Sequence, residues 1–144
     1  MQKTYHHPAE MIFRRAEKYK NRSAIQYRDK NGKWQKIAWL DFAEYVRLTS
    51  QAMIEYGIEP HENIGICAQN MPECFFTDYG AYGIRAVSVP MYATSSPAQI
   101  EYIVRDARIR FLFVGEQLQY NNAFRIQQGN RDILKKLIIF DPAV

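Results

Sequence analysis

The sequence predicts an α/β protein in which a mostly parallel sheet carries helices on both faces and an antiparallel hairpin lies at the periphery. Several short apolar runs lack the alternation of half-buried strands, as expected when both faces of a strand are covered. Helical spans separate these runs along the second half of the chain. Near residue 30, two segments flank an Asn31-Gly32 pair, which is typical of a hairpin turn. The pattern leaves the strand order open.

The length of 144 residues suits one domain, 1–144, with a helix, hairpin and helix in 1–60 and βαβ-type units in 61–144. The chain has 19 basic and 15 acidic residues, and its net charge of +4 is too small to indicate nucleic-acid binding without a concentrated patch. No apolar run approaches a membrane span, and the N-terminus lacks the apolar core of a signal peptide. We therefore expect no transmembrane segment and a cytoplasmic location.

The first helix is expected to start near Pro8 and to have one apolar face and one basic face. We interpret the basic face as solvated helix surface, in preference to a patch that binds nucleic acid or a membrane. His6 and His7 are interpreted as surface residues, because no third metal ligand lies nearby in the sequence. The predicted apolar face consists of Ala9, Ile12, Phe13, Ala16 and Tyr19.

The hairpin is expected to pair residues 24–28 with 33–37. A second helix should run from about Trp39 to Tyr56 and end at Gly57, which is free to take a positive φ. Its predicted apolar stripe consists of Phe42, Tyr45, Val46, Thr49, Met53 and Tyr56.

A βαβ unit is expected over residues 63–90. Residues 64–68 form an apolar run suited to a buried strand, and Asn70 with Glu73 has the pattern of a capping box around Pro72. The second strand, 86–89, is predicted to be buried and to close at Pro90. The helix between them carries Phe75, Tyr79 and Tyr82 at helical spacing, with Phe76, Gly80 and Gly83 on a groove of small residues.

Three further elements follow a loop over residues 91–95. Ser96, Pro97 and Gln99 predict a capped helix start, and the expected buried side of that helix is Ile100, Ile103, Val104 and Ala107. A strand is predicted at 111–114, a weaker helix at 116–128 and a last strand at 137–140.

Four short motifs in this order resemble the N-terminal part of AMP-forming acyl-CoA synthetases, and the resemblance covers nearly the whole chain. They are Ile64-Gly65-Ile66, Asn70-x-Pro72-Glu73, Ala86-Val87-x-Val89-Pro90 and Ser96-Pro97. The segment from Pro90 to Pro97 is most similar to long-chain fatty acid–CoA ligases.

Two positions depart from the pattern of the resembled family. Ala38 stands where a capping threonine usually precedes the second helix, which weakens the helix start by about 1 kcal/mol. Arg85 stands where a glycine is usual before the second strand of the βαβ unit. Either the helix cap has moved to Gly83, or Arg85 accepts a strained φ.

The resemblance implies a ligase that uses ATP, magnesium and coenzyme A on a fatty acid. It also implies a Gly-rich phosphate loop beyond Val144, and we find no such loop within the chain. We therefore expect the fragment to be inactive alone and to bind no cofactor, and we assign it no catalytic, cofactor-binding or metal residue. Self-association is expected through surface left uncovered by the end at Val144. The glycines are dispersed at Gly32, Gly57, Gly65, Gly80, Gly83, Gly115 and Gly129.

Other candidate sites have simpler interpretations. His61 with Glu62 is expected in a surface turn, and Cys67 and Cys74 are expected to be reduced, mostly buried thiols. The aromatic residues of 75–82 could line an acyl pocket, but core packing is favoured. The loop 91–95 is the preferred place for substrate contact, near the coenzyme A route implied by the resemblance. The alternative function is a non-catalytic α/β binding or oligomerisation module with a basic helix.

Overall fold

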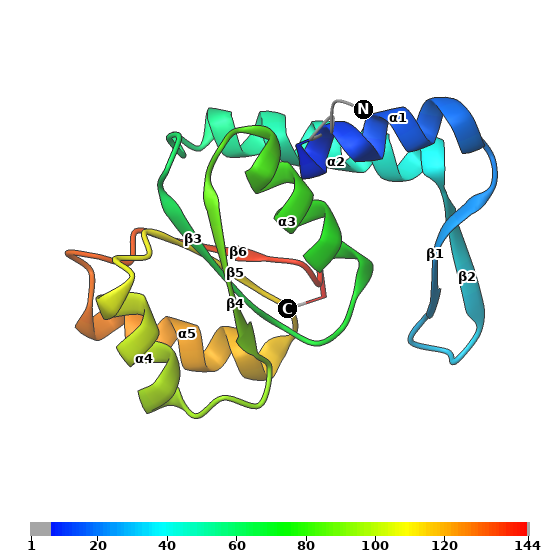
Figure 1. Ribbon diagram of the computed structural model, residues 1–144. Coiled ribbons are helices and arrows are strands. Elements are labelled where there is room, and N and C mark those ends of the chain that lie inside the picture. Colours follow the sequence, from blue (N-terminus) through cyan, green and yellow to red (C-terminus); the bar gives the residue numbers. More distant parts are fainter. Residues whose placement is uncertain (1–6, 144) are drawn as a thin grey trace.

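The computed structural model describes residues 7–143, which form two sheets and five helices (Figure 1). The elements are α1 (Pro8–Tyr19), β1 (Ser23–Arg28), β2 (Trp34–Ala38), α2 (Trp39–Glu55), β3 (Asn63–Ala68), α3 (Pro72–Gly83), β4 (Val87–Tyr92), α4 (Pro97–Asp106), β5 (Phe111–Val114), α5 (Gln117–Gly129) and β6 (Lys136–Ile139).

The main sheet has the strand order β4-β3-β5-β6, and all of its neighbouring strands are parallel. One core cluster joins α2 and α3 to one face of this sheet, through residues such as Met53, Ile64 and Phe113. A second cluster joins α4 and α5 to the other face, through residues such as Ile100, Leu112 and Ile126. The predicted α/β fold, with helices on both faces and a separate hairpin, is therefore confirmed.

The hairpin of β1 and β2 forms its own antiparallel sheet and projects from the end of α1 and α2 (Figure 1). Its turn forms as the Asn-Gly signal predicts, with Gly32 at φ +74°. Asp29 Oδ1 accepts hydrogen bonds of 2.9 Å from the amides of both Asn31 and Lys33. Such side-chain bonds to nearby backbone are a common means of fixing a turn.

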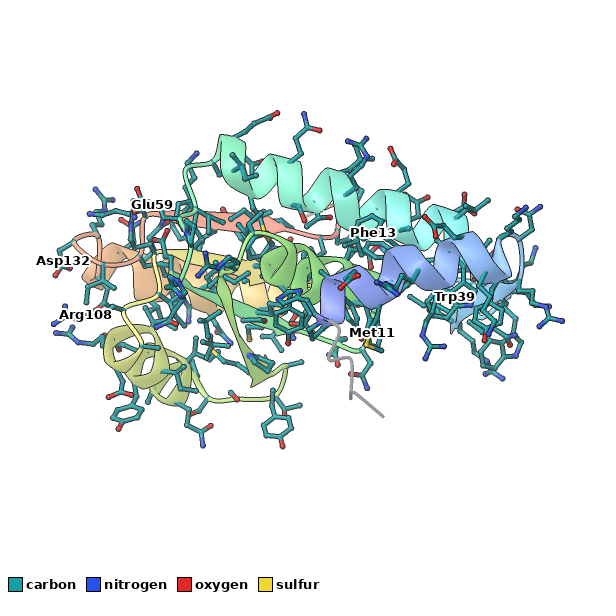
Figure 2. All side chains as sticks on the ribbon, turned by 45° about the horizontal axis from the view of Figure 1, so that its top comes forward. Met11, Phe13, Trp39, Glu59, Arg108 and Asp132 are labelled. Atoms are coloured by element: carbon teal, nitrogen blue, oxygen red, sulfur yellow. The ribbon has the colours of Figure 1, made fainter. Side chains whose placement is uncertain are left out.

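The first helix starts at Pro8 as predicted, with His7 Nδ1 accepting from the amide of Ala9 at 3.3 Å. Its buried residues are Ala9, Ile12 and Ala16. The prediction that Phe13 belongs to the buried face is wrong, since its side chain is 39% exposed. Successive residues turn by about 100° around a helix, so a neighbour of Ile12 falls at the margin of the buried stripe. Figure 2 shows Met11 and Phe13 on opposite sides of α1.

The second helix also differs from its predicted stripe. Phe42, Val46 and Met53 are buried, whereas Tyr45 and Tyr56 are 45% and 44% exposed. As expected, no side chain caps the helix at Ala38, and Gly57 takes a φ of +82° after its end.

The start of α3 contradicts the predicted capping box. Met71, not Asn70, occupies the N-cap, and its side chain makes no capping hydrogen bond. Pro72 explains the difference, because it forces an extended conformation on the preceding residue and removes one of the amides that a cap would satisfy. Met71 has φ −135° and ψ 155°, as this restriction requires.

Strand β4 contradicts the predicted end at Pro90, because it continues through Pro90 to Tyr92. It is also an edge strand, and Val87 and Tyr92 are 45% and 84% exposed. An edge strand tolerates proline because the missing amide faces solvent instead of a neighbouring strand. The predicted loop therefore shrinks to residues 93–95.

The structure resolves the alternatives at Arg85. The cap has not moved: α3 runs to Gly83, and Arg85 takes a φ of +64°. His61 on the neighbouring turn has a φ of +68° and donates from its amide to the carbonyl of Arg85 at 2.7 Å. Gly80 and Gly83 of α3 lie close to α2. A Cβ at Gly80 would lie 2.9 Å from Thr49 Cγ2, and one at Gly83 would lie 2.8 Å from Ser50 Oγ.

Candidate functional site at the carboxyl edge of the sheet

The strand order creates a crevice between β3 and β5. The chain leaves β3 for α3 on one face and leaves β5 for α5 on the other, so the two connections diverge from adjacent strands. Crevices of this kind, beyond the carboxyl ends of parallel strands, are where α/β sheets bind ligands. Gly115 brings the two connections close together, since a Cβ there would lie 2.9 Å from the Cβ of Ala68.

The end of the hairpin forms one wall of this crevice. A cavity of about 350 Å³ lies between hairpin residues 27–30, residues 69–73 after β3 and Glu116 after β5. Lys30 Nζ donates to Asp141 Oδ2 at 2.6 Å, which joins the hairpin to the segment that follows β6. This hydrogen bond holds the pKa of Asp141 below its ordinary value. The hairpin is therefore tied to the same edge of the sheet as the crevice.

Residues 93–95 leave the sheet at the same edge. Gln119, which is almost fully buried, donates from Nε2 to the carbonyl of Ala93 at 3.1 Å. Ser96 caps α4 as predicted, accepting from the amide of Gln99 at 3.3 Å, while Gln99 Oε1 accepts from the amide of Ser96 at 2.9 Å. The hydroxyl of Ser96 is thus engaged in a helix cap, and Tyr92 is the most exposed aromatic side chain beside this loop.

Glu73 lies in surroundings that the capping-box interpretation did not anticipate. Its Oε2 is buried, and among residues 7–143 no hydrogen-bond donor reaches it. The side chain lines three adjacent cavities, one of them the crevice. A buried carboxylate oxygen without a donor is costly to the folded state. Sequence spacing gave no sign of this, because it depends on the packing of α2 and the hairpin around α3.

The other sequence candidates take the simpler interpretations. His61 Nε2 lies 3.1 Å from Arg85 Nη2, and within residues 7–143 no serine or cysteine hydrogen-bonds to its ring. Phe76 and Tyr79 pack at 5.8 Å from Phe42, within the contact between α2 and α3, whereas Phe75 is about half exposed.

Both cysteines are unpaired. Burial raises the pKa of Cys67 to about 11, and burial is also the main cause of a raised pKa at Cys74. His6 lies outside the described residues, whereas His7 caps α1. Within residues 7–143, no group of three or more histidine, cysteine, aspartate or glutamate side chains could hold a metal ion.

The basic residues of α1 are partly engaged within the chain. Arg14 Nη2 pairs with Glu10 Oε1 at 2.6 Å, and Arg15 lies over the ring of Trp39 at 5.7 Å. None of the helices described is both long enough and apolar enough to span a membrane.

The fold is a parallel α/β sheet with a crevice at its carboxyl edge, and the comparison with known proteins identifies its family. The AMP-binding enzyme family matches residues 12–143, and the chain belongs to this family.

The curated relatives are named as long-chain fatty acid–CoA ligases. ACSBG1 of Rattus norvegicus is 28% identical over 131 residues, which cover 91% of this chain and 18% of that protein. ACSBG2 of Homo sapiens is 30% identical over 110 residues, covering 76% of this chain and 16% of the relative. The chain thus spans less than a fifth of the length of these relatives.

Solved structures share the fold. A long-chain fatty acid–CoA ligase (FadD1) from Archaeoglobus fulgidus superposes with a TM-score of 0.83 at 19% identity, over 96% of this chain and 28% of that one. A benzoate CoA ligase from Burkholderia xenovorans LB400 superposes with a TM-score of 0.82 at 19% identity, over 97% of this chain and 27% of that one.

Proposed function

We propose that this chain is the N-terminal part of a cytoplasmic long-chain fatty acid–CoA ligase. The observation that carries the proposal is the alignment to a long-chain fatty acid–CoA ligase, which covers 91% of the chain at 28% identity. It agrees with the match to the AMP-binding enzyme family. The complete protein would join a fatty acid to ATP, giving an acyl-adenylate and pyrophosphate, and would then transfer the acyl group to coenzyme A. Magnesium would accompany the ATP.

The described residues do not fit ATP or its metal. A triphosphate requires clustered backbone amides and a cation, and the seven glycines of this chain enclose no such loop. The carboxylates and histidines described do not gather into a metal site either. The proposal therefore assigns the cofactors to the remainder of the ligase, and we expect the separate chain to be inactive. Calorimetric titration with Mg-ATP should give no saturable site in the micromolar range.

The contribution of this chain is the crevice at the carboxyl edge. Its walls come from the segment after β3, the segment after β5 and the end of the hairpin. In the complete enzyme we propose that these walls border the substrate site. Three features support this: the divergence of α3 and α5, the close approach at Gly115, and the tie between Lys30 and Asp141.

A chimera tests the proposal. Residues 8–143 would replace the superposed segment of the Archaeoglobus ligase, and pyrophosphate release would be measured with a long-chain acid and with benzoate. A folded chimera that releases pyrophosphate with the long-chain acid in preference to benzoate supports the assignment. A folded chimera without activity on either acid contradicts it.

Two matched variants of the chimera test the crevice. Asn70 is exposed and lines the cavity, whereas Asn121 is exposed on α5 and does not. Asn70→Ala should raise KM for a substrate, and Asn121→Ala should leave KM unchanged. If the two variants have equal KM values, the crevice does not border the substrate site.

A further inference from the structure

The side chain of Gln119 joins two segments at the carboxyl edge of the sheet. Its Nε2 donates to the carbonyl of Ala93 at 3.1 Å, and its Oε1 accepts from the amide of Glu116 at 3.2 Å. Ala93 opens the loop of residues 93–95 between β4 and α4, whereas Glu116 follows β5 and lines the crevice. Strands β4 and β5 are not neighbours, because β3 lies between them. Gln119 therefore connects the ends of two strands that do not pair with each other.

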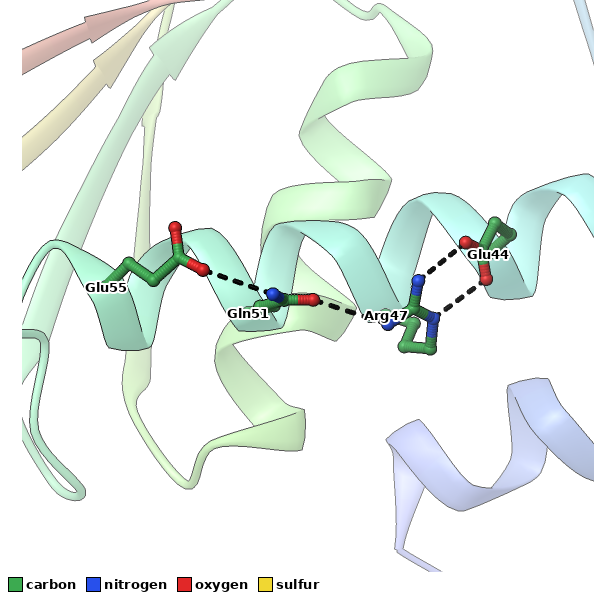
Figure 3. Close-up of polar contacts among 4 residues, drawn as sticks. All are labelled: Glu44, Arg47, Gln51 and Glu55. Carbon is green, nitrogen blue, oxygen red and sulfur yellow. Dashed lines mark hydrogen bonds and ion pairs between the residues drawn. The ribbon is translucent and has the colours of Figure 1, made fainter.

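Burial gives both hydrogen bonds their weight. Gln119 is only 2% exposed, so water does not readily replace either bond when it is lost. The glutamine in Figure 3 shows the contrast: Gln51 accepts from Arg47 and donates to Glu55 on the exposed side of α2. Bonds of that kind lie within one helix, contribute little to stability and position nothing outside the helix. The bond from Gln119 to Ala93 joins two parts of the fold.

The loop of residues 93–95 depends on this bond for its place beside the crevice. The amide of Ser95 donates to the carbonyl of Tyr92 at 3.0 Å, which closes a turn within the loop but does not reach α5. The bond from Gln119 reaches across, because Gln119 lies on α5, 26 residues further along the chain. The orientation of the loop relative to the crevice is therefore set by this glutamine.

The far end of α4 is held independently of Gln119. Asn130, at the end of α5, accepts from Arg105 Nη1 at 2.7 Å and donates to Glu101 Oε1 at 2.9 Å. Both partners belong to α4, so the two helices stay joined when the bond to Ala93 is lost. Loss of that bond should thus loosen the loop of residues 93–95 and leave the helix pair in place.

We propose that Gln119 is a positioning residue of the substrate site, which holds the loop of residues 93–95 in the place that substrate binding requires. This role rests on the proposed function, because the crevice borders a substrate site only if the chain is part of the ligase. Gln119 is buried and does not touch the substrate itself. Without its bond, substrate binding has to order the loop, so affinity falls while the chemical step is unchanged. Such a change is measured as a higher KM at constant kcat.

Amide hydrogen exchange of the 144-residue chain tests the contact between Gln119 and the loop. Gln119→Met keeps a long unbranched side chain but has no donor, so exchange in the loop should become about fivefold faster or more. Gln127→Met is the matched control, because Gln127 lies on the same helix and donates from Nε2 to the carbonyl of Lys135 at 3.2 Å. It should leave exchange in residues 93–95 unchanged. Equal exchange in the loop for Gln119→Met and the unchanged chain would overturn the proposal.

Kinetics of the ligase chimera described above test the positioning role. In a folded chimera, Gln119→Met should raise KM about three- to tenfold for at least one of the fatty acid, ATP and coenzyme A, with kcat changed by less than about twofold. Gln127→Met should leave every KM unchanged. A lower kcat with unchanged KM values would mark Gln119 as a residue of structural importance alone, and the proposal would be wrong.

Gln119→Glu adds a pH signature and covers the case in which Gln119→Met does not fold. A protonated glutamic acid donates to the carbonyl of Ala93 and accepts from the amide of Glu116, as the glutamine does, whereas its carboxylate only accepts. The ratio of its KM to that of the unchanged chimera should therefore fall towards one as the pH falls, and a ratio that is constant with pH contradicts the role. An unchanged chimera without activity contradicts the proposed function and this role together. An active chimera whose KM values are unaffected by the Gln119 variants contradicts this role alone.

Discussion

Replacing Arg85 isolates the cost of a left-handed backbone at the end of α3. Arg85 has a φ of +64°, a region in which an L-residue with a Cβ is strained by about 1–2 kcal/mol. Arg85→Gly relieves this strain, but it also removes the contact with His61 and loosens the unfolded chain. Arg85→Ala removes the same contact and keeps the Cβ. The difference between the two variants therefore reports the backbone alone.

We expect the glycine variant to be more stable than the alanine variant by about 1 kcal/mol, after the greater freedom of unfolded glycine is subtracted. At this chain length, this corresponds to a Tm difference of about 3–4 °C. Arg125 offers the matched control, because it is an exposed arginine inside α5. There the order should invert, since glycine in a helix interior costs about 1 kcal/mol relative to alanine.

Urea denaturation followed by circular dichroism measures all four variants. The comparison requires the same denaturant slope for each, so that the difference in midpoint reflects stability alone. If the alanine variant at position 85 is as stable as the glycine variant, the strain assigned to Arg85 is absent. The same conclusion follows if the alanine variant is the more stable of the two at both position 85 and position 125.

Three further predictions concern buried polar groups. Burial raises the pKa of Asp78 above its ordinary value, despite a 2.6 Å hydrogen bond that the hydroxyl of Ser88 on β4 donates to its Oδ1. The pKa of Asp78 is therefore higher in the folded state than in the unfolded state. The stability that comes from the protonated carboxyl is fully present below the unfolded-state pKa, and it is lost as the pH rises through the folded-state pKa. Asp78→Asn should reduce this fall in unfolding free energy with rising pH. An unchanged pH profile of stability would refute the raised pKa of Asp78. Asn130 is fully buried and hydrogen-bonds to two side chains of α4, so Asn130→Ala should cost about 2–4 kcal/mol in urea denaturation, against less than about 0.5 for Asn121→Ala. Cys67 and Cys74 should label slowly in the native state and fast in denaturant, and rapid native labelling of both would contradict the packing around β3.

Local signals in the sequence are accurate where no neighbouring residue imposes a competing restriction. The turn at Asn31-Gly32 and the cap at Ser96 each depend on fewer than about five neighbouring residues, and both form as predicted. Asn70 was misjudged even so, because Pro72 changes the conformation of the residue between them. The restriction that proline places on the residue before it therefore outweighs the capping pattern.

Features that depend on distant contacts could not be predicted. The exposure of Val87 follows from the edge position of β4, and the pattern in the sequence leaves strand order open. The crevice combines hairpin residues with segments after β3 and β5, so no single stretch of sequence shows it. The unpaired oxygen of Glu73 likewise arises from packing between elements.

The ion pair between Lys30 and Asp141 also sets a sequence of events during synthesis. The partners are 111 residues apart, so the hairpin leaves the ribosome long before its anchor does. At translation speeds of about 5–20 residues per second, this interval lasts about 5–20 seconds. For that time the hairpin has to persist on its own turn and its packing against the first two helices. The hairpin wall of the crevice is anchored only when Asp141, after β6, has emerged.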